Sequence, residues 1–143
     1  MTLQLEGVVA LVTGSSRGGG RGIALALGEA GAIVYITGRS TRTQASSKDL
    51  TGTIEDTAEE VTSRGGMGIA VRCDHTVEED VQALYAQIKQ EQGKLDLLVN
   101  NAWGGYENID DAFLAPFWEQ PMTRWDKCLT QDCVPKWFLA SMR

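Results

Sequence analysis

The stretch that decides the fold is Thr13-Gly14-Ser15-Ser16-Arg17-Gly18-Gly19-Gly20-Arg21-Gly22-Ile23-Ala24, which directly follows the apolar run at residues 8–12. A glycine-rich turn between a buried strand and a helix N-terminus is a common binding site for the pyrophosphate of a dinucleotide. Gly14, Gly18 and Gly20 let phosphate oxygens approach the backbone without meeting a Cβ atom. The following helix directs its unpaired N–H groups and the positive end of its dipole at that anion. The stretch therefore predicts a phosphate-binding turn, and a tight turn without a ligand is the alternative.

Length and composition indicate one ordinary globular domain over residues 1–143. The chain is 43% hydrophobic and 22% charged, within the usual range for such a domain. Its net charge of −6 argues against nucleic acid as a partner. No apolar run reaches membrane-spanning length, so we expect no membrane partner. Residues 1–7 lack the features of a signal peptide, which predicts a cytoplasmic protein.

The cysteine and histidine content predicts no metal site. Cys73, Cys128 and Cys133 have neither a metal-ligand nor a CxxC spacing, so we expect three reduced thiols. His75 is the only histidine in the sequence, which excludes a multi-histidine site.

Short apolar runs alternate with amphipathic stretches along the chain, which predicts an α/β fold with a parallel sheet covered by helices on both faces. We expect strands at residues 8–12, 33–37, 69–73 and 95–99. We expect the three intervening helices to end near Gly31, Gly65 and Gly93, and a further helix to begin near Thr123. This order predicts a doubly wound sheet with strand order 3-2-1-4 and an exposed edge at the fourth strand.

The third of these helices has its own start signal. Thr76-Val77-Glu78-Glu79 fits a capping box, in which Thr76 would accept from a helical N–H and Glu79 would reach back.

The end of the second strand indicates which dinucleotide would bind. An acidic residue there would select NAD through the ribose 2′-hydroxyl. This chain has Thr37-Gly38-Arg39-Ser40 and no carboxylate before Asp49. The planar fork of Arg39 suits a 2′-phosphate, and Arg17 could reach the same group. The residues therefore predict NADP over NAD, although both arginines could also be solvated surface residues.

Three motifs in this order resemble the short-chain dehydrogenase/reductase family. They are Thr13-Gly14-x-x-x-Gly18-x-Gly20, Asp74 after the third strand and Asn100-Asn101-Ala102 after the fourth. The resemblance covers nearly the whole chain and implies a Rossmann-type fold. The polar loop at residues 40–53, together with Trp103-Gly104-Gly105 and Pro116-Phe117-Trp118-Glu119, resembles the dehydrogenase/reductase member 1 branch of that family.

The resemblance implies a role for several of these residues. Asp74 would accept a hydrogen bond from the adenine amino group, with a turn-capping carboxylate as the alternative. Asn100 would stabilise the central sheet, while Asn101 and Ala102 would line the cofactor near its ribose. The complete set of expected cofactor-binding residues is Gly14, Ser16, Arg17, Gly18, Gly19, Gly20, Arg39, Asp74, Asn101 and Ala102.

The family's catalytic residues have no counterpart in this sequence. A catalytic Ser and a Tyr-x-x-x-Lys would follow the Asn-Asn-Ala segment, and the chain ends at Arg143 before either. Tyr85 and Lys89 have the right spacing but precede that segment, on a helix expected to lie far from the nicotinamide. Asp132 stands where the family has an asparagine of the proton relay. We therefore expect no catalytic residue in this chain and a sheet truncated before the family's later strands.

Two functions follow from these expectations. The first is an NADP(H)-dependent oxidoreductase that transfers a hydride to or from a small carbonyl or alcohol substrate. This chain would supply its cofactor-binding half and would have little or no activity alone. The second is a non-catalytic dinucleotide-binding or interaction module complete at this length. Its open edge and its tryptophans, all between residues 103 and 137, predict a homo-oligomer.

Overall fold

The computed structural model describes residues 4–44, 50–103 and 115–123. The chain forms two compact units, Met1–Ala102 and Trp103–Arg143. The first unit alternates strands and helices: β1 (Val9–Val12), α1 (Gly18–Glu29), β2 (Ile33–Gly38), α2 (Ile54–Ser63), β3 (Met67–Arg72), α3 (Glu78–Gln92) and β4 (Leu97–Val99). In the second unit, η3 (Phe117–Glu119) is a short 3-10 helix. The alternating pattern of the sequence is confirmed.

The strands form one parallel sheet in the order β3-β2-β1-β4, as predicted. Val12 of β1 is in register with Ile36 of β2 on one side and with Val99 of β4 on the other. The segments that follow β1, β2 and β4 therefore leave the sheet at one edge. This edge contains the glycine-rich turn, Arg39 and Asn101, so the topology brings together residues far apart in the sequence.

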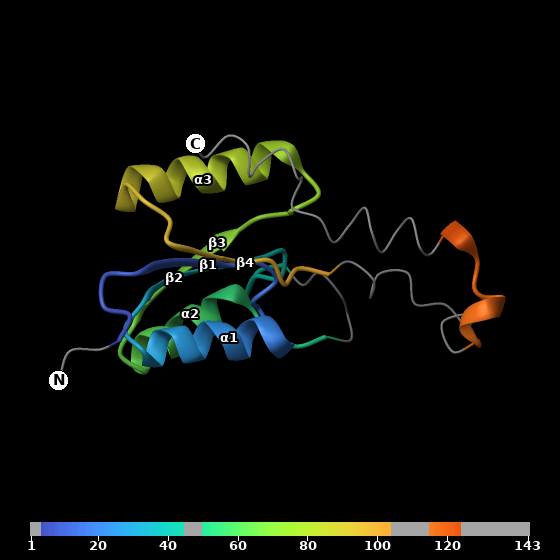
Figure 1. The fold of residues 1–143 in the computed structure, drawn as a ribbon, viewed down its shortest axis with the longest axis horizontal. Helices are drawn as coiled ribbons and strands as arrows, with labels where there is room; N and C mark the ends of the chain where they lie inside the picture. Colours follow the sequence, from blue (N-terminus) through green and yellow to red (C-terminus); the bar gives the residue numbers. More distant parts are fainter. Residues whose placement is uncertain (1–3, 45–49, 104–114, 124–143) are drawn as a thin grey trace. The chain divides into compact units, whose positions relative to one another are not determined.

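Helices cover both faces of the sheet, with α1 and α2 on one side and α3 on the other (Figure 1). Val12, Val34 and Ile36 share a core cluster with residues of α1 and α2. Leu11 and Tyr35, the alternate positions of the same strands, are also fully buried. Successive side chains of a strand point to opposite faces, so β1 and the first four residues of β2 carry apolar side chains toward both faces.

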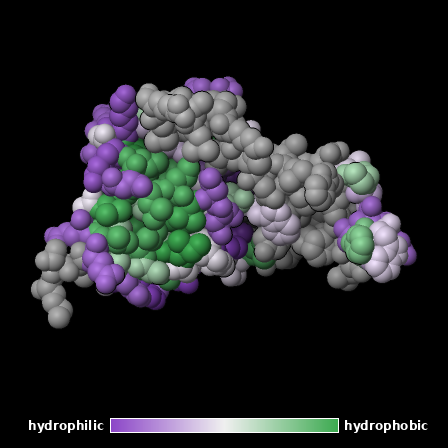
Figure 2. Space-filling model, in the orientation of Figure 1, coloured by the Kyte–Doolittle hydropathy of each residue, from purple (hydrophilic) through white to green (hydrophobic). Residues whose placement is uncertain are grey.

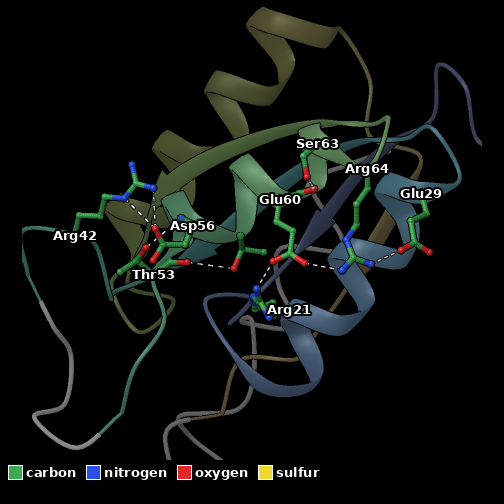
Figure 3. Close-up of polar contacts among 9 residues, drawn as sticks. Arg21, Glu29, Arg42, Thr53, Asp56, Glu60, Ser63 and Arg64 are labelled. Atoms are coloured by element: carbon green, nitrogen blue, oxygen red, sulfur yellow. Dashed lines mark hydrogen bonds and ion pairs between the residues drawn. The ribbon is translucent and has the colours of Figure 1, made fainter.

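Ion pairs join α1 to α2 on the outer surface. Glu60 of α2 lies between Arg21 of α1 and Arg64, and Arg64 also contacts Glu29 of α1 (Figure 3). These side chains are partly exposed, so we expect a modest contribution to stability from each pair.

The capping box predicted at Thr76 is wrong. α3 begins at Glu78, its N-cap is Val77, and no side chain caps it. The Thr76 side chain instead donates to Asp74 Oδ1 over 2.7 Å, and the Thr76 N–H donates to the same oxygen over 3.0 Å. Asp74 therefore forms a local turn that engages the hydroxyl that would have capped the helix.

β4 forms an edge of the described sheet, as the strand pattern predicts. Leu97 of this strand is 37% exposed. Figure 2 shows hydrophobic side chains gathered on the surface between α3 and α1. The described helices include none that is both long and apolar enough to span a membrane.

The second unit is described only at Trp103 and at residues 115–123. Phe117 and Trp118 are exposed and pack edge to face, with ring centroids 5.0 Å apart. The helix expected from Thr123 and the position of Asp132 fall at residues 124–143, outside the described residues.

Candidate cofactor site

The glycine-rich turn starts from a network of hydrogen bonds at the end of β1. Ser15 Oγ donates to the Val12 carbonyl oxygen over 2.7 Å and accepts the Thr37 N–H over 3.1 Å. Thr13 Oγ1 accepts the N–H groups of Asn101 and Ala102, each over 2.9 Å. These short polar side chains satisfy backbone groups where the strand ladders end, so the turn has a defined shape.

Asn101 holds the inner side of the turn. Its side-chain amide donates to the carbonyl oxygens of Thr13 and Gly14, each over 3.0 Å. A Cβ added at Gly14 would lie 2.7 Å from Ala102 Cα, and one added at Gly20 would lie 2.5 Å from the Gly14 carbonyl oxygen. Both glycines are therefore required by packing within the protein. Asn101 thus joins the end of β4 to the turn after β1, whereas Asn100, for which the family resemblance implies contacts that stabilise the sheet, is exposed.

The outer side of the turn is open. A Cβ at Gly18 would meet no atom within 4 Å, and one at Gly19 would be in ordinary contact with Asn101. Ser16 is buried beneath the turn, whereas Gly18 and Gly19 are exposed. The first turn of α1 contains no acidic residue, and its N-cap, Arg17, provides no side-chain cap. The site thus presents free backbone and an uncompensated helix N-terminus, a combination that suits a phosphate.

Arg17 links the turn to the segments around the long loop between β2 and α2. Its Nη2 donates to Ser40 Oγ over 2.6 Å and to the Gly52 carbonyl oxygen over 3.1 Å. Its Nε donates to the Thr51 carbonyl oxygen over 3.0 Å. The guanidinium of Arg17 therefore already connects the glycine-rich turn to the segments at both ends of this loop.

Arg39 and Asp74 lie close together beyond the ends of β2 and β3. Arg39 Nη1 is 3.9 Å from Asp74 Oδ2, and Asp74 Oδ1 accepts from Thr76. Burial alone would raise the pKa of Asp74, but the hydrogen bonds from Thr76 and the charge of Arg39 lower it. Asp74 thus caps a turn with one oxygen and keeps the other on the side of Arg39.

His75 connects the Asp74 turn to the sheet. Its Nε2 lies 2.8 Å from Thr37 Oγ1, and its Nδ1 lies 3.7 Å from the sulfur of the buried Cys73. Burial lowers the pKa of His75 to about 4, although the charges of Asp74 and Asp80 act in the opposite direction. Burial also raises the pKa of the Cys73 thiol to about 12. Both groups are therefore neutral near pH 7.

The lowered pKa of His75 predicts a pH-dependent stability. The unfolded chain binds this proton at about pH 6.5 and the folded chain only near pH 4, so folding is favoured above this window and weakened within it. We expect the free energy of unfolding to fall by roughly 2 kcal/mol between pH 7 and pH 5. Urea unfolding at both pH values would measure the change. His75→Gln should show a much smaller change, and an equal change in this variant would contradict the assignment.

Tyr85 and Lys89 both lie on α3, as expected. Burial raises the pKa of Tyr85 to about 12, the opposite direction from the activation that proton transfer by a tyrosine needs.

Sequence reasoning assigned no role to the side chains of Thr13, Thr37, Ser40 or His75. Thr13 and Thr37 stand at strand ends, where a short hydroxyl side chain after an apolar run can satisfy backbone groups of the neighbouring strand. That position was the available signal for both. No sequence pattern pairs His75 with Thr37, because 38 residues separate them.

Known proteins are similar to this chain in sequence and in fold. The family model described as short chain dehydrogenase matches residues 8–134. The chain belongs to the short-chain dehydrogenase family. It is 45% identical over 127 residues to dehydrogenase/reductase SDR family member 1 of Mus musculus, covering 88% of this chain and 37% of that protein. The family resemblance inferred from the sequence is therefore confirmed.

Two further comparisons extend this result. The chain is 35% identical over 115 residues to the 7alpha-hydroxysteroid dehydrogenase of Escherichia coli K12, covering 80% of this chain and 41% of that protein. A crystal structure of a metagenomic short-chain oxidoreductase in complex with NADP matches with a TM-score of 0.65 and 29% identity, covering 89% of this chain and 50% of that one. The chain spans less than half the length of these two curated relatives.

Proposed function

We propose that this chain supplies the NADP(H)-binding half of a short-chain dehydrogenase that transfers a hydride to or from a carbonyl or alcohol substrate. We propose further that the chain alone has little or no turnover. The family's Tyr-x-x-x-Lys would follow Asn100-Asn101-Ala102, and residues 103–143 contain no tyrosine with a lysine four positions later.

The observation that carries the proposal is the open side of the glycine-rich turn. Gly18 and Gly19 leave free space over the N-terminus of α1, while Asn101 and Gly20 fill the inner side. A dinucleotide pyrophosphate needs this arrangement, because its oxygens accept from backbone N–H groups at close range. The residues present therefore fit the cofactor.

Two observations support NADP over NAD. Arg39 stands at the position after β2 where an acidic residue would bind the ribose of NAD, and its side chain is 33% exposed. The related metagenomic oxidoreductase was crystallised in complex with NADP. A partly exposed guanidinium next to this position favours a ligand that carries one more phosphate.

The contributions of the protein in this half of the site are binding and orientation. A bound nicotinamide would supply or accept the hydride. Gly18, Gly19 and the N-terminus of α1 would hold the pyrophosphate, and Arg39 would hold the 2′-phosphate. Asp74 would accept from the adenine amino group through the oxygen that Thr76 does not use. Asn101 and Ala102 would border the ribose on the nicotinamide side.

Titration of the chain with NADPH and NADH, followed by calorimetry or nicotinamide fluorescence, tests the proposal. We expect NADPH to bind at least tenfold more tightly than NADH, since a charge-assisted hydrogen bond contributes roughly 1.5–3 kcal/mol. We also expect this preference to shrink as salt is added. Failure of a folded sample to bind either dinucleotide would contradict the proposal.

Three expectations from the sequence stay predictions. They are the cytoplasmic location, the homo-oligomer and the single dinucleotide-binding domain over residues 1–143.

A further inference from the structure

A series of hydrogen bonds links Cys73, His75, Thr37 and Val12 near the proposed adenine end of the site. The Thr37 hydroxyl donates to the Val12 carbonyl oxygen over 3.3 Å. A hydroxyl has one hydrogen, so when Thr37 donates to Val12, the 2.8 Å contact with His75 is a hydrogen bond only if Nε2 carries a proton and donates to Thr37 Oγ1; we adopt this tautomer. Nδ1 then accepts from the Cys73 thiol at 3.7 Å. Each donor in this series of hydrogen bonds, from the Cys73 thiol to the Thr37 hydroxyl, thus has an acceptor.

This series of hydrogen bonds joins the ends of three strands. Cys73 follows β3, Thr37 belongs to β2, and Val12 ends β1. Thr37 also binds the glycine-rich turn, because its N–H donates to Ser15 Oγ and its carbonyl oxygen accepts the Ser15 N–H over 3.0 Å. His75 is therefore the connection between the Asp74 turn and the phosphate turn.

Asp74 lies in the sequence between Cys73 and His75, and hydrogen bonds to β2 hold both of these residues. On one side, the Cys73 N–H donates to the Gly38 carbonyl oxygen over 3.1 Å. On the other side, the His75 ring is anchored to Thr37. The Asp74 N–H is also held, by Asp80 Oδ2 over 2.9 Å. With both neighbours fixed, the Asp74 carboxylate points toward Thr76 and Arg39.

We propose that His75 is a positioning residue of the cofactor site: through its bond to Thr37, it directs the Asp74 carboxylate at the adenine amino group. This inference rests on the proposed dinucleotide function. It assigns a role in recognising the base to a side chain that touches no part of the cofactor.

The tautomer can be measured without any substitution. His75 is the only histidine in the chain, so its ring nitrogens give an unambiguous ¹H–¹⁵N correlation spectrum. We expect a neutral ring protonated at Nε2 near pH 7. A ring protonated at Nδ1, or a charged ring, would overturn the inference.

A matched pair of variants tests the positioning role. His75→Gln keeps an amide near the position of Nε2 and can still donate to Thr37, whereas the shorter side chain of His75→Asn cannot reach it. The readout is the affinity for NADPH divided by that for 6-deamino-NADPH, which carries a carbonyl oxygen in place of the adenine amino group. Thr37→Val, which removes the acceptor and keeps the side-chain shape, provides a second test of the same bond.

We expect wild type and His75→Gln to prefer NADPH by roughly tenfold or more. We expect the ratio to fall to about 1–3 in His75→Asn and Thr37→Val, because a displaced carboxylate loses its selectivity for the base. A loss of stability alone would weaken both ligands equally and leave the ratio unchanged. An unchanged ratio in His75→Asn would overturn the inference, while the proposed function would stand. If wild type binds neither ligand, the proposed function itself fails.

Discussion

Gly20→Ala should destabilise the chain by roughly 2–4 kcal/mol and abolish dinucleotide binding. The added Cβ would lie 2.5 Å from the Gly14 carbonyl oxygen and would also collide with the Asn101 side-chain amide. Neither neighbour can withdraw easily, because Asn101 donates to the carbonyl oxygens of Thr13 and Gly14 over 3.0 Å each. Relief of the clash therefore breaks the bonds that shape the turn. Urea unfolding and an NADPH titration would measure both effects.

Gly22→Ala provides the matched control on the same helix. Its Cβ would meet no atom within 4 Å, and Gly22 is exposed. We expect the free energy of unfolding of this variant to rise by about 0.5–1 kcal/mol, because alanine loses less backbone entropy than glycine when a helix forms. If the two variants were equally stable, the close packing of Asn101 against the turn would be wrong.

Arg39→Asp should reduce the affinity for NADPH by roughly 100-fold and change the affinity for NADH much less. The substitution removes the charged donors proposed for the 2′-phosphate and places a carboxylate there, which repels that phosphate. It also brings two acidic side chains together, because Arg39 Nη1 lies 3.9 Å from Asp74 Oδ2 in the native chain. Calorimetric titrations with both dinucleotides would give the ratio of affinities.

Lys89→Glu controls for the change in net charge in that experiment. Lys89 is exposed on α3, which covers the face of the sheet opposite α1 and α2 (Figure 1). We expect this variant to keep the wild-type preference for NADPH, because a distant exposed charge is screened by salt. An equal loss for both dinucleotides in Arg39→Asp would show that Arg39 does not read the 2′-phosphate.

Much of the fold could be predicted from local patterns in the sequence. The apolar residues 9–12 of β1 and 33–36 of β2 indicate strands buried on both faces. Ile54, Ala58 and Val61 recur at i, i+4 and i+7, a spacing typical of an amphipathic helix, and all three are buried in α2. The capping box failed because Asp74, two residues before Thr76, accepts the hydrogen bond of its hydroxyl. Two local motifs overlapped there, and the pattern alone did not decide between them.

The site was only partly predictable. The sequence by itself determined the family motif, the glycine-rich turn after β1 and the absence of an acidic residue at the end of β2, because these features depend on residues that are neighbours in the sequence. Only the tertiary structure decided which glycines are required by packing. It also decided that Arg17 binds the loop after β2 and that His75 bonds to Thr37. Those facts depend on parallel strands ending at one edge of the sheet, where hydrogen bonds join residues 23 to 89 positions apart. Local periodicity carries no information on such distant pairs, and tertiary packing determines them.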